Sequence, residues 1–108
     1  KPQVWYLDLF AGKNDYEAVR RAGESGHKEI NRTNLSTDQI TEGLKKDVVQ
    51  KQLALIRMRN THKAFSEGAE VAISGGERSL EIRWEYNSAF ATLYVNFESG
   101  TYTIVESR

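Results

Sequence analysis

The stretch that decides the fold is LEIRWEY at residues 80–86, where every second side chain is apolar. Charged side chains fill the positions between, and such alternation is typical of a β-strand with one buried face. Residues 91–97 repeat the alternation after a turn at 87–88, and residues 102–104 begin it again after a turn at 99–100. The pattern predicts antiparallel strands joined by tight turns.

The apolar period changes from helical to alternating near Phe65. Residues 71–73 add a short alternation ahead of a Gly-Gly pair, so we expect about four strands in an antiparallel meander. This change predicts a boundary, with a small β-domain at 63–108 and a unit of different make-up at 1–62. The fold class is therefore expected to be α+β.

Two helices are predicted before this boundary. Ser36 and Gln39 form a capping box at the start of a short helix near 37–45. Apolar residues at 49, 53 and 56 form one stripe of a longer helix near 48–61. Asp15 is expected to cap a further short helix.

The apolar run VWYLDLF at residues 4–10 predicts a strand. Its nearly continuous apolar character suits a parallel strand that is covered on both faces. A protein does not usually begin with a buried strand, so we expect the chain to be a piece of a longer protein. Residues 11–15 form a turn after this strand, and residues 23–35 are expected to form an ordered polar loop.

Composition narrows the functional classes. The 108 residues carry 15 basic and 15 acidic side chains and no cysteine. The balanced charge gives no electrostatic case for binding nucleic acid or an anionic membrane. The lack of cysteine excludes disulfides and zinc-thiolate sites, and a reducing, cytoplasmic location fits. His27 and His62 have no partner at metal-ligand spacing, so we expect no metal and no cofactor.

Three further patterns have both a functional and a structural interpretation. The aromatic side chains of the strands suit a sugar-binding platform, but cross-strand pairing is the favoured interpretation. The basic side chains of residues 45–63, Lys46 among them, are interpreted as a solvated helix face. Arg32 lies in the polar loop between the first strand and a capped helix, where a guanidinium can form paired hydrogen bonds to a carboxylate or to sugar hydroxyls.

Several segments together resemble the sucrose phosphorylases, which belong to glycoside hydrolase family thirteen, the α-amylase family. VWYLDLFAGKND at residues 4–15 resembles their last barrel strand and the loop after it. EINR at residues 29–32 resembles the next loop motif. LIRMRNTHKAF at residues 55–65 resembles the closing barrel helix and its exit into a C-terminal β-domain. The three segments match in order and spacing.

The resemblance implies that residues 1–62 are the end of a (β/α)8 barrel, with one strand and two or three helices. It also implies a parent enzyme that passes a glucosyl unit from sucrose to phosphate with retention, giving α-glucose 1-phosphate and fructose. The three catalytic carboxyl groups of this family precede the last barrel strand. We therefore assign no catalytic residue here and expect the chain alone to be inactive.

The resemblance further implies that Asn31 and Arg32 bind substrate, since the family's arginine closes the glucosyl subsite. Residues 33–35 depart from the family, which often has a histidine and two aromatic residues there. A glucosylglycerate phosphorylase, a sucrose 6-phosphate phosphorylase and a hydrolase therefore stay open as alternatives.

A stand-alone, non-catalytic α+β binding module is the rival class. Such a module would cover residues 4–10 with its own side chains. A barrel strand without its neighbours would instead leave an open edge and apolar surface. In that case we expect the chain to self-associate through this segment.

Overall fold

The computed structural model describes residues 3–108, which divide into two compact units, one ending at Ile56 and one running from Arg57 to Arg108. The predicted boundary at residues 62 and 63 is close to this division. Within the described residues, no helix is both long enough and apolar enough to span a membrane.

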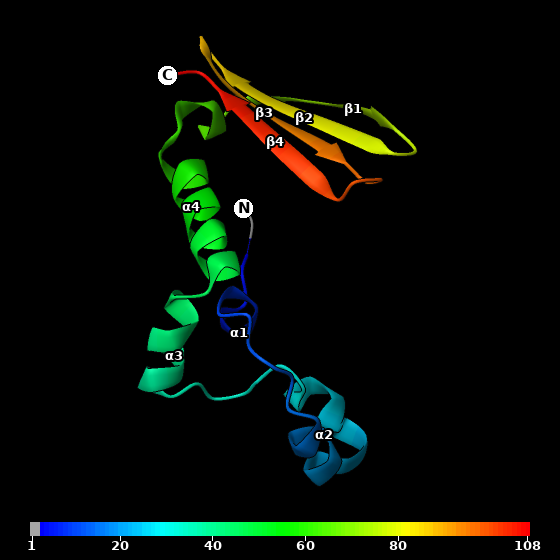
Figure 1. Cartoon of the computed structure of the whole chain (residues 1–108). Helices are drawn as coiled ribbons and strands as arrows, with labels where there is room; N and C mark the ends of the chain where they lie inside the picture. The colour runs from blue at the N-terminus through cyan, green and yellow to red at the C-terminus, as the bar shows by residue number, and fades with distance from the viewer. Residues whose placement is uncertain (1–2) are drawn as a thin grey trace. The chain divides into compact units, whose positions relative to one another are not determined.

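The second unit is built on one antiparallel sheet with the strand order β1-β2-β3-β4 (Figure 1). The strands are β1 (Glu70–Gly76), β2 (Ser79–Tyr86), β3 (Ala89–Asn96) and β4 (Thr101–Glu106). The predicted meander is thus confirmed, and its register pairs Ile73 with Ile82, Ile82 with Leu93, and Leu93 with Ile104. Because side chains alternate along each strand, this register gathers the isoleucines and the leucine on one face.

The 3₁₀-helix η2 (Lys63–Phe65) packs against β2 and β3. Ala64 is fully buried, and the Phe65 ring lies 5.3 Å from that of Trp84. His62 fastens this helix to the end of the chain: Nδ1 accepts a hydrogen bond from the Ala64 amide at 3.2 Å, and Nε2 lies 2.9 Å from the Ser107 carbonyl. These two contacts suit a neutral imidazole with its proton on Nε2, so His62 is a packing residue here.

The first unit contains α2 (Tyr16–Ala22), η1 (Gly23–Glu29), α3 (Thr37–Leu44) and the start of α4 (Asp47–Thr61). The three predicted helices are confirmed. The Asp15 carboxylate accepts a hydrogen bond from the Ala18 amide at 2.9 Å, and Ser36 with Gln39 completes both bonds of the capping box. Part of the region expected to be loop is helical instead, since η1 occupies Gly23–Glu29.

The predicted strand at residues 4–10 is wrong. Residues Tyr6–Leu9 form the short helix α1, in which the Leu9 amide bonds the Trp5 carbonyl at 3.0 Å and the Phe10 amide bonds the Tyr6 carbonyl at 3.1 Å. None of the strands in the described residues pairs with this segment. Its backbone groups therefore find local partners in place of a sheet ladder.

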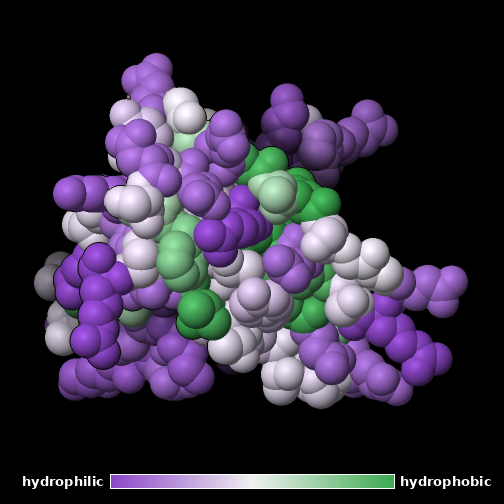
Figure 2. Space-filling model, turned by 90° about the horizontal axis from the view of Figure 1, so that it is seen from above, coloured by the Kyte–Doolittle hydropathy of each residue, from purple (hydrophilic) through white to green (hydrophobic). Residues whose placement is uncertain are grey.

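The expectation of apolar surface at this segment agrees with the structure. Leu7 is buried with 1% exposure, whereas Val4 and Trp5 are 49% and 45% exposed. Hydrophobic side chains, green in Figure 2, also reach the surface between hydrophilic ones. The segment is thus only partly covered by the residues that the structure describes.

Candidate functional site

A cavity of about 320 Å³ lies beside the turn that follows α1. Three segments of the first unit line it: the turn itself, the polar stretch after η1, and one side of α3 with its C-terminal end. The lining residues are Phe10, Ala11, Gly12, Lys13, Thr33, Leu35, Gln39, Glu42, Gly43 and Lys46. One lining residue, Thr33, directly follows the predicted substrate-binding residues Asn31 and Arg32.

Close packing and an uncommon backbone conformation shape the turn. Ala11 has φ of 47°, in the left-handed region, which costs an L-residue about 1–2 kcal/mol. A Cβ atom at Gly12 would lie 2.3 Å from Cδ1 of the buried Leu7. A Cβ atom at Gly43 would lie 3.1 Å from the Phe10 ring. Both glycines thus permit a close approach that builds this side of the cavity.

Three side-chain hydrogen bonds tie the polar stretch after η1 to residues 5–13. Trp5 Nε1 donates to the Asn31 carbonyl at 2.7 Å, and the Tyr6 hydroxyl donates to the Thr33 carbonyl. Thr33 Oγ1 donates to the Lys13 carbonyl at 3.1 Å. Of these residues, Lys13 and Thr33 line the cavity.

Arg32 lies in this stretch but does not line the cavity. Its Nη1 atom donates to the Glu29 carboxylate at 3.1 Å, and its side chain is 54% exposed. Of the two predicted substrate-binding residues, Asn31 uses its carbonyl oxygen to hold Trp5. Both residues precede Thr33, which lines the cavity, and their contact with substrate stays a prediction.

Lys46, which lies between α3 and α4, also contacts the turn. It is exposed, as the interpretation of the basic stretch as a solvated face expects, but its ammonium group also binds the backbone. Its Nζ atom donates to the Phe10 carbonyl at 3.1 Å and to the Ala11 carbonyl at 3.0 Å. No sequence signal separates it from Lys45, whose Nζ atom pairs with Glu42 at 2.6 Å.

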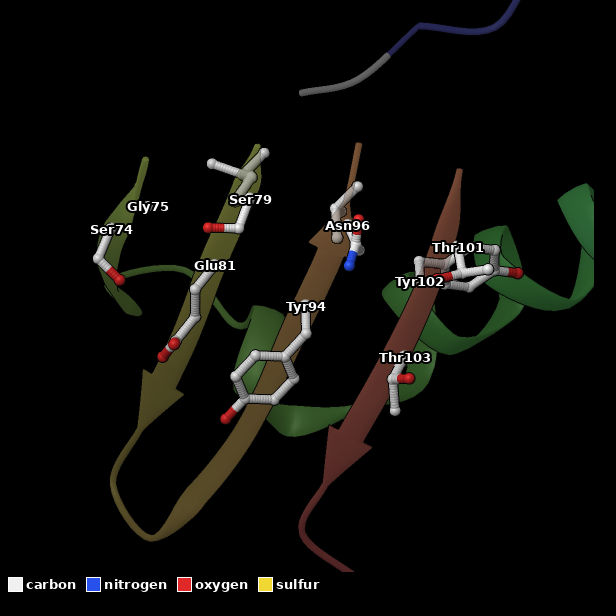
Figure 3. A pocket seen from close by; sticks show the side chains of 11 residues that line it. Ser74, Gly75, Ser79, Glu81, Tyr94, Asn96, Thr101, Tyr102 and Thr103 are labelled. Carbon is white, nitrogen blue, oxygen red and sulfur yellow. The ribbon is translucent and has the colours of Figure 1, made fainter. Parts of the chain in front are cut away.

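A second hollow, of about 280 Å³, lies on the polar face of the sheet (Figure 3). The register places Glu81 opposite Tyr94 and Tyr94 opposite Thr103, so these side chains share that face. Trp84 and Tyr102 fall on the alternate positions, which belong to the other face, although Tyr102 also lines the hollow. The aromatic residues of the strands therefore do not form one platform.

Metal binding has no support in the described residues, which contain no cluster of three or more histidine, cysteine or carboxylate side chains suited to an ion. His62 is engaged with backbone groups, as described above.

The chain is similar to sugar phosphorylases over nearly its whole length, although no protein-family model matches it. It is 50% identical over 103 residues to a sucrose 6(F)-phosphate phosphorylase of Ilumatobacter coccineus, covering 95% of this chain and 20% of that protein. It is 39% identical over 106 residues to a sucrose phosphorylase of Agrobacterium vitis, covering 98% and 21%.

The fold agrees with a solved structure as well. The crystal structure of sucrose 6F-phosphate phosphorylase from Thermoanaerobacter thermosaccharolyticum superposes with a TM-score of 0.87 at 35% identity, over 99% of this chain and 21% of that one. The chain thus spans about a fifth of the length of the relatives that it matches.

Proposed function

We propose, since the chain belongs to the sucrose phosphorylase family, that it forms the C-terminal part of a retaining α-glucoside phosphorylase. The observation that carries the proposal is sequence identity of 50% across 95% of the chain to one such phosphorylase. The longer enzyme would move a glucosyl unit from its donor to inorganic phosphate and release α-glucose 1-phosphate. Its catalytic carboxyl groups would lie outside residues 1–108, and the chain alone is predicted to be inactive.

The donor is the first question for experiment. Sucrose, sucrose 6-phosphate and glucosylglycerate are the candidates, and two of the relatives are named sucrose 6(F)-phosphate phosphorylases. The full-length enzyme is incubated with phosphate and each donor in turn, and α-glucose 1-phosphate is measured. Its formation from at least one donor supports a phosphorylase. Glucose release that is independent of phosphate would identify a hydrolase, and no turnover of any donor would favour the non-catalytic binding module.

Within this enzyme, Asn31 and Arg32 are proposed to contact the glucosyl unit. The support is their position directly before Thr33, which lines the cavity, together with the hydrogen bond of 2.7 Å from Trp5 to the Asn31 carbonyl. Arg32 would exchange its exposed contact with Glu29 for substrate or for a carboxylate elsewhere in the enzyme.

The test of Arg32 is the variant Arg32→Ala in the full-length enzyme. We expect most of the transfer activity to be lost while the melting temperature is unchanged, because small misplacement of a reacting sugar is costly in rate. Arg20→Ala is the control, since Arg20 is also an exposed partner of a glutamate three residues away. Near-normal turnover by Arg32→Ala would refute the assignment.

Three further statements belong to this proposal. Residues 1–62 and 63–108 would be the barrel end and the C-terminal β-domain of the longer enzyme. The chain by itself would associate with a second copy through the exposed side chains of Val4 and Trp5. The enzyme would be cytoplasmic.

A further inference from the structure

We infer that Lys46 is a positioning residue for substrate binding, because its ammonium group fixes the turn that walls the cavity. This inference rests on the proposed function. It adds a residue that neither the sequence motifs nor the names of the relatives indicate.

Lys46 binds two successive carbonyl groups of the turn. Its Nζ atom lies 3.1 Å from the Phe10 oxygen and 3.0 Å from the Ala11 oxygen. Both carbonyls must face the same cation, which selects one orientation of the two peptide planes. Charge-assisted hydrogen bonds are stronger than neutral ones, so the ammonium group restrains the two carbonyl groups more than hydrogen bonds from water would.

The turn that Lys46 contacts has the hydrogen bonds of a Schellman motif at the end of α1, with Ala11 as the left-handed residue. Ala11 has φ of 47°, and such a residue keeps a left-handed conformation only where its surroundings enforce it. The Ala11 amide bonds the Asp8 carbonyl at 3.0 Å, and the Gly12 amide bonds the Leu7 carbonyl at 2.8 Å. These two bonds hold amide groups of the turn, and Lys46 holds the carbonyl groups of Phe10 and Ala11.

Lys46 is itself held by the backbone between α3 and α4. Its amide donates to the Gly43 carbonyl at 3.0 Å, and its carbonyl accepts from the Gln50 amide at 3.0 Å. These bonds fix the backbone from which the Lys46 side chain extends, as a positioning residue requires.

The restraint extends to the predicted substrate-binding motif. The Lys13 carbonyl at the far end of the turn accepts the Thr33 hydroxyl at 3.1 Å, and Thr33 directly follows Arg32. Without the Lys46 ammonium group, the two carbonyl groups would turn toward water. The cavity wall from Phe10 to Lys13 would then no longer keep one conformation. Substrate would then bind to a pocket that is competent only part of the time.

The kinetic test compares Lys46→Met, Lys46→Arg and Lys45→Met in the full-length enzyme. Lys45 is the matched control because it is adjacent, exposed and paired only with Glu42 among the described residues. We expect Lys46→Met to lower kcat/KM for the donor roughly tenfold or more, mainly by raising KM. Lys46→Arg should restore most of it, and Lys45→Met should differ from wild type less than about twofold.

A purely structural role would give a different result. In that case Lys46→Met would lower kcat in proportion to the folded fraction, with KM unchanged. That outcome, or equal KM values for all three variants, would overturn the inference.

A measurement without turnover separates this inference from the proposed function. Hydrogen–deuterium exchange of the amides at residues 10–14 should be faster in Lys46→Met than in Lys45→Met. Unchanged exchange would refute the role of Lys46 even in an active enzyme. If wild type turns over no donor, the proposed function fails, and exchange still decides whether Lys46 holds the turn.

Discussion

The lack of a side chain at Gly12 permits the close packing of the cavity wall. Its Cα approaches the buried Leu7 so closely that an added Cβ would lie 2.3 Å from Cδ1 and 2.9 Å from Cγ. The sequence identified this position only as part of a turn, because glycine is common in turns for several reasons. The need for a small residue comes from Leu7, whose burial only the structure shows.

We expect Gly12→Ala to lower the free energy of unfolding by about 1–3 kcal/mol, as overpacking does in other cores. The measurement is urea unfolding of the full-length enzyme. Ala11→Gly is the neighbouring control and should not destabilise, because it relieves a left-handed alanine with φ of 47°. Equal midpoints for Gly12→Ala and wild type would contradict the steric explanation.

At the scale of elements, capping signals were the most reliable guide. Asp15 and Ser36 both cap the helices for which they were predicted, since each bond involves residues only three positions apart. Such local hydrogen bonds depend little on the rest of the molecule. The strand predicted at residues 4–10 was wrong because a continuous apolar run does not distinguish a helix from a strand, and the outcome depends on the available partners.

The cap of α3 can be tested directly. Ser36→Ala should destabilise the protein by about 1 kcal/mol, because the Gln39 amide loses its acceptor at 3.2 Å. Ser36→Asp keeps an acceptor and should retain most of the stability. The thermal unfolding midpoints of both variants give the answer, and an equal loss in both would show that the side-chain bond is not the cause.

The β1–β2 hairpin offers a matched pair of glycines. Gly75 has φ of 153°, and a Cβ atom there would lie 2.3 Å from the Ser79 carbonyl oxygen, whereas Gly76 has no neighbour within 4 Å of such an atom. We expect Gly75→Ala to cost about 2 kcal/mol or more and Gly76→Ala less than about 0.5 kcal/mol. Unfolding midpoints that fall equally in both variants would contradict this difference.

At the scale of the whole molecule, apolar surface remains in the described part of the chain. Val4 and Trp5 are about half exposed beside the buried Leu7. We expect another protein segment to cover these exposed apolar side chains. About four-fifths of the relative's length lies outside the matched region, and residues of that part could cover such a surface.

We expect the isolated chain to associate with increasing concentration, as light scattering would show. Val4→Lys should weaken the association, since a charge in a buried apolar contact is costly. Val48→Lys is the control, because Val48 is 50% exposed and lies on α4. A monomer at every concentration, or equal weakening by both variants, would refute association through the first segment.

The sequence by itself determined the four-stranded meander, three helices and the resemblance to sucrose phosphorylases. These depend on alternation, caps and motif order, which are all properties of short stretches. Only the tertiary structure decided that residues 6–9 are helical, that Arg32 pairs with Glu29 outside the cavity, and that Lys46 binds the turn. The Lys46 contact joins residues 36 and 35 positions apart, and no local pattern encodes which distant carbonyl a lysine reaches.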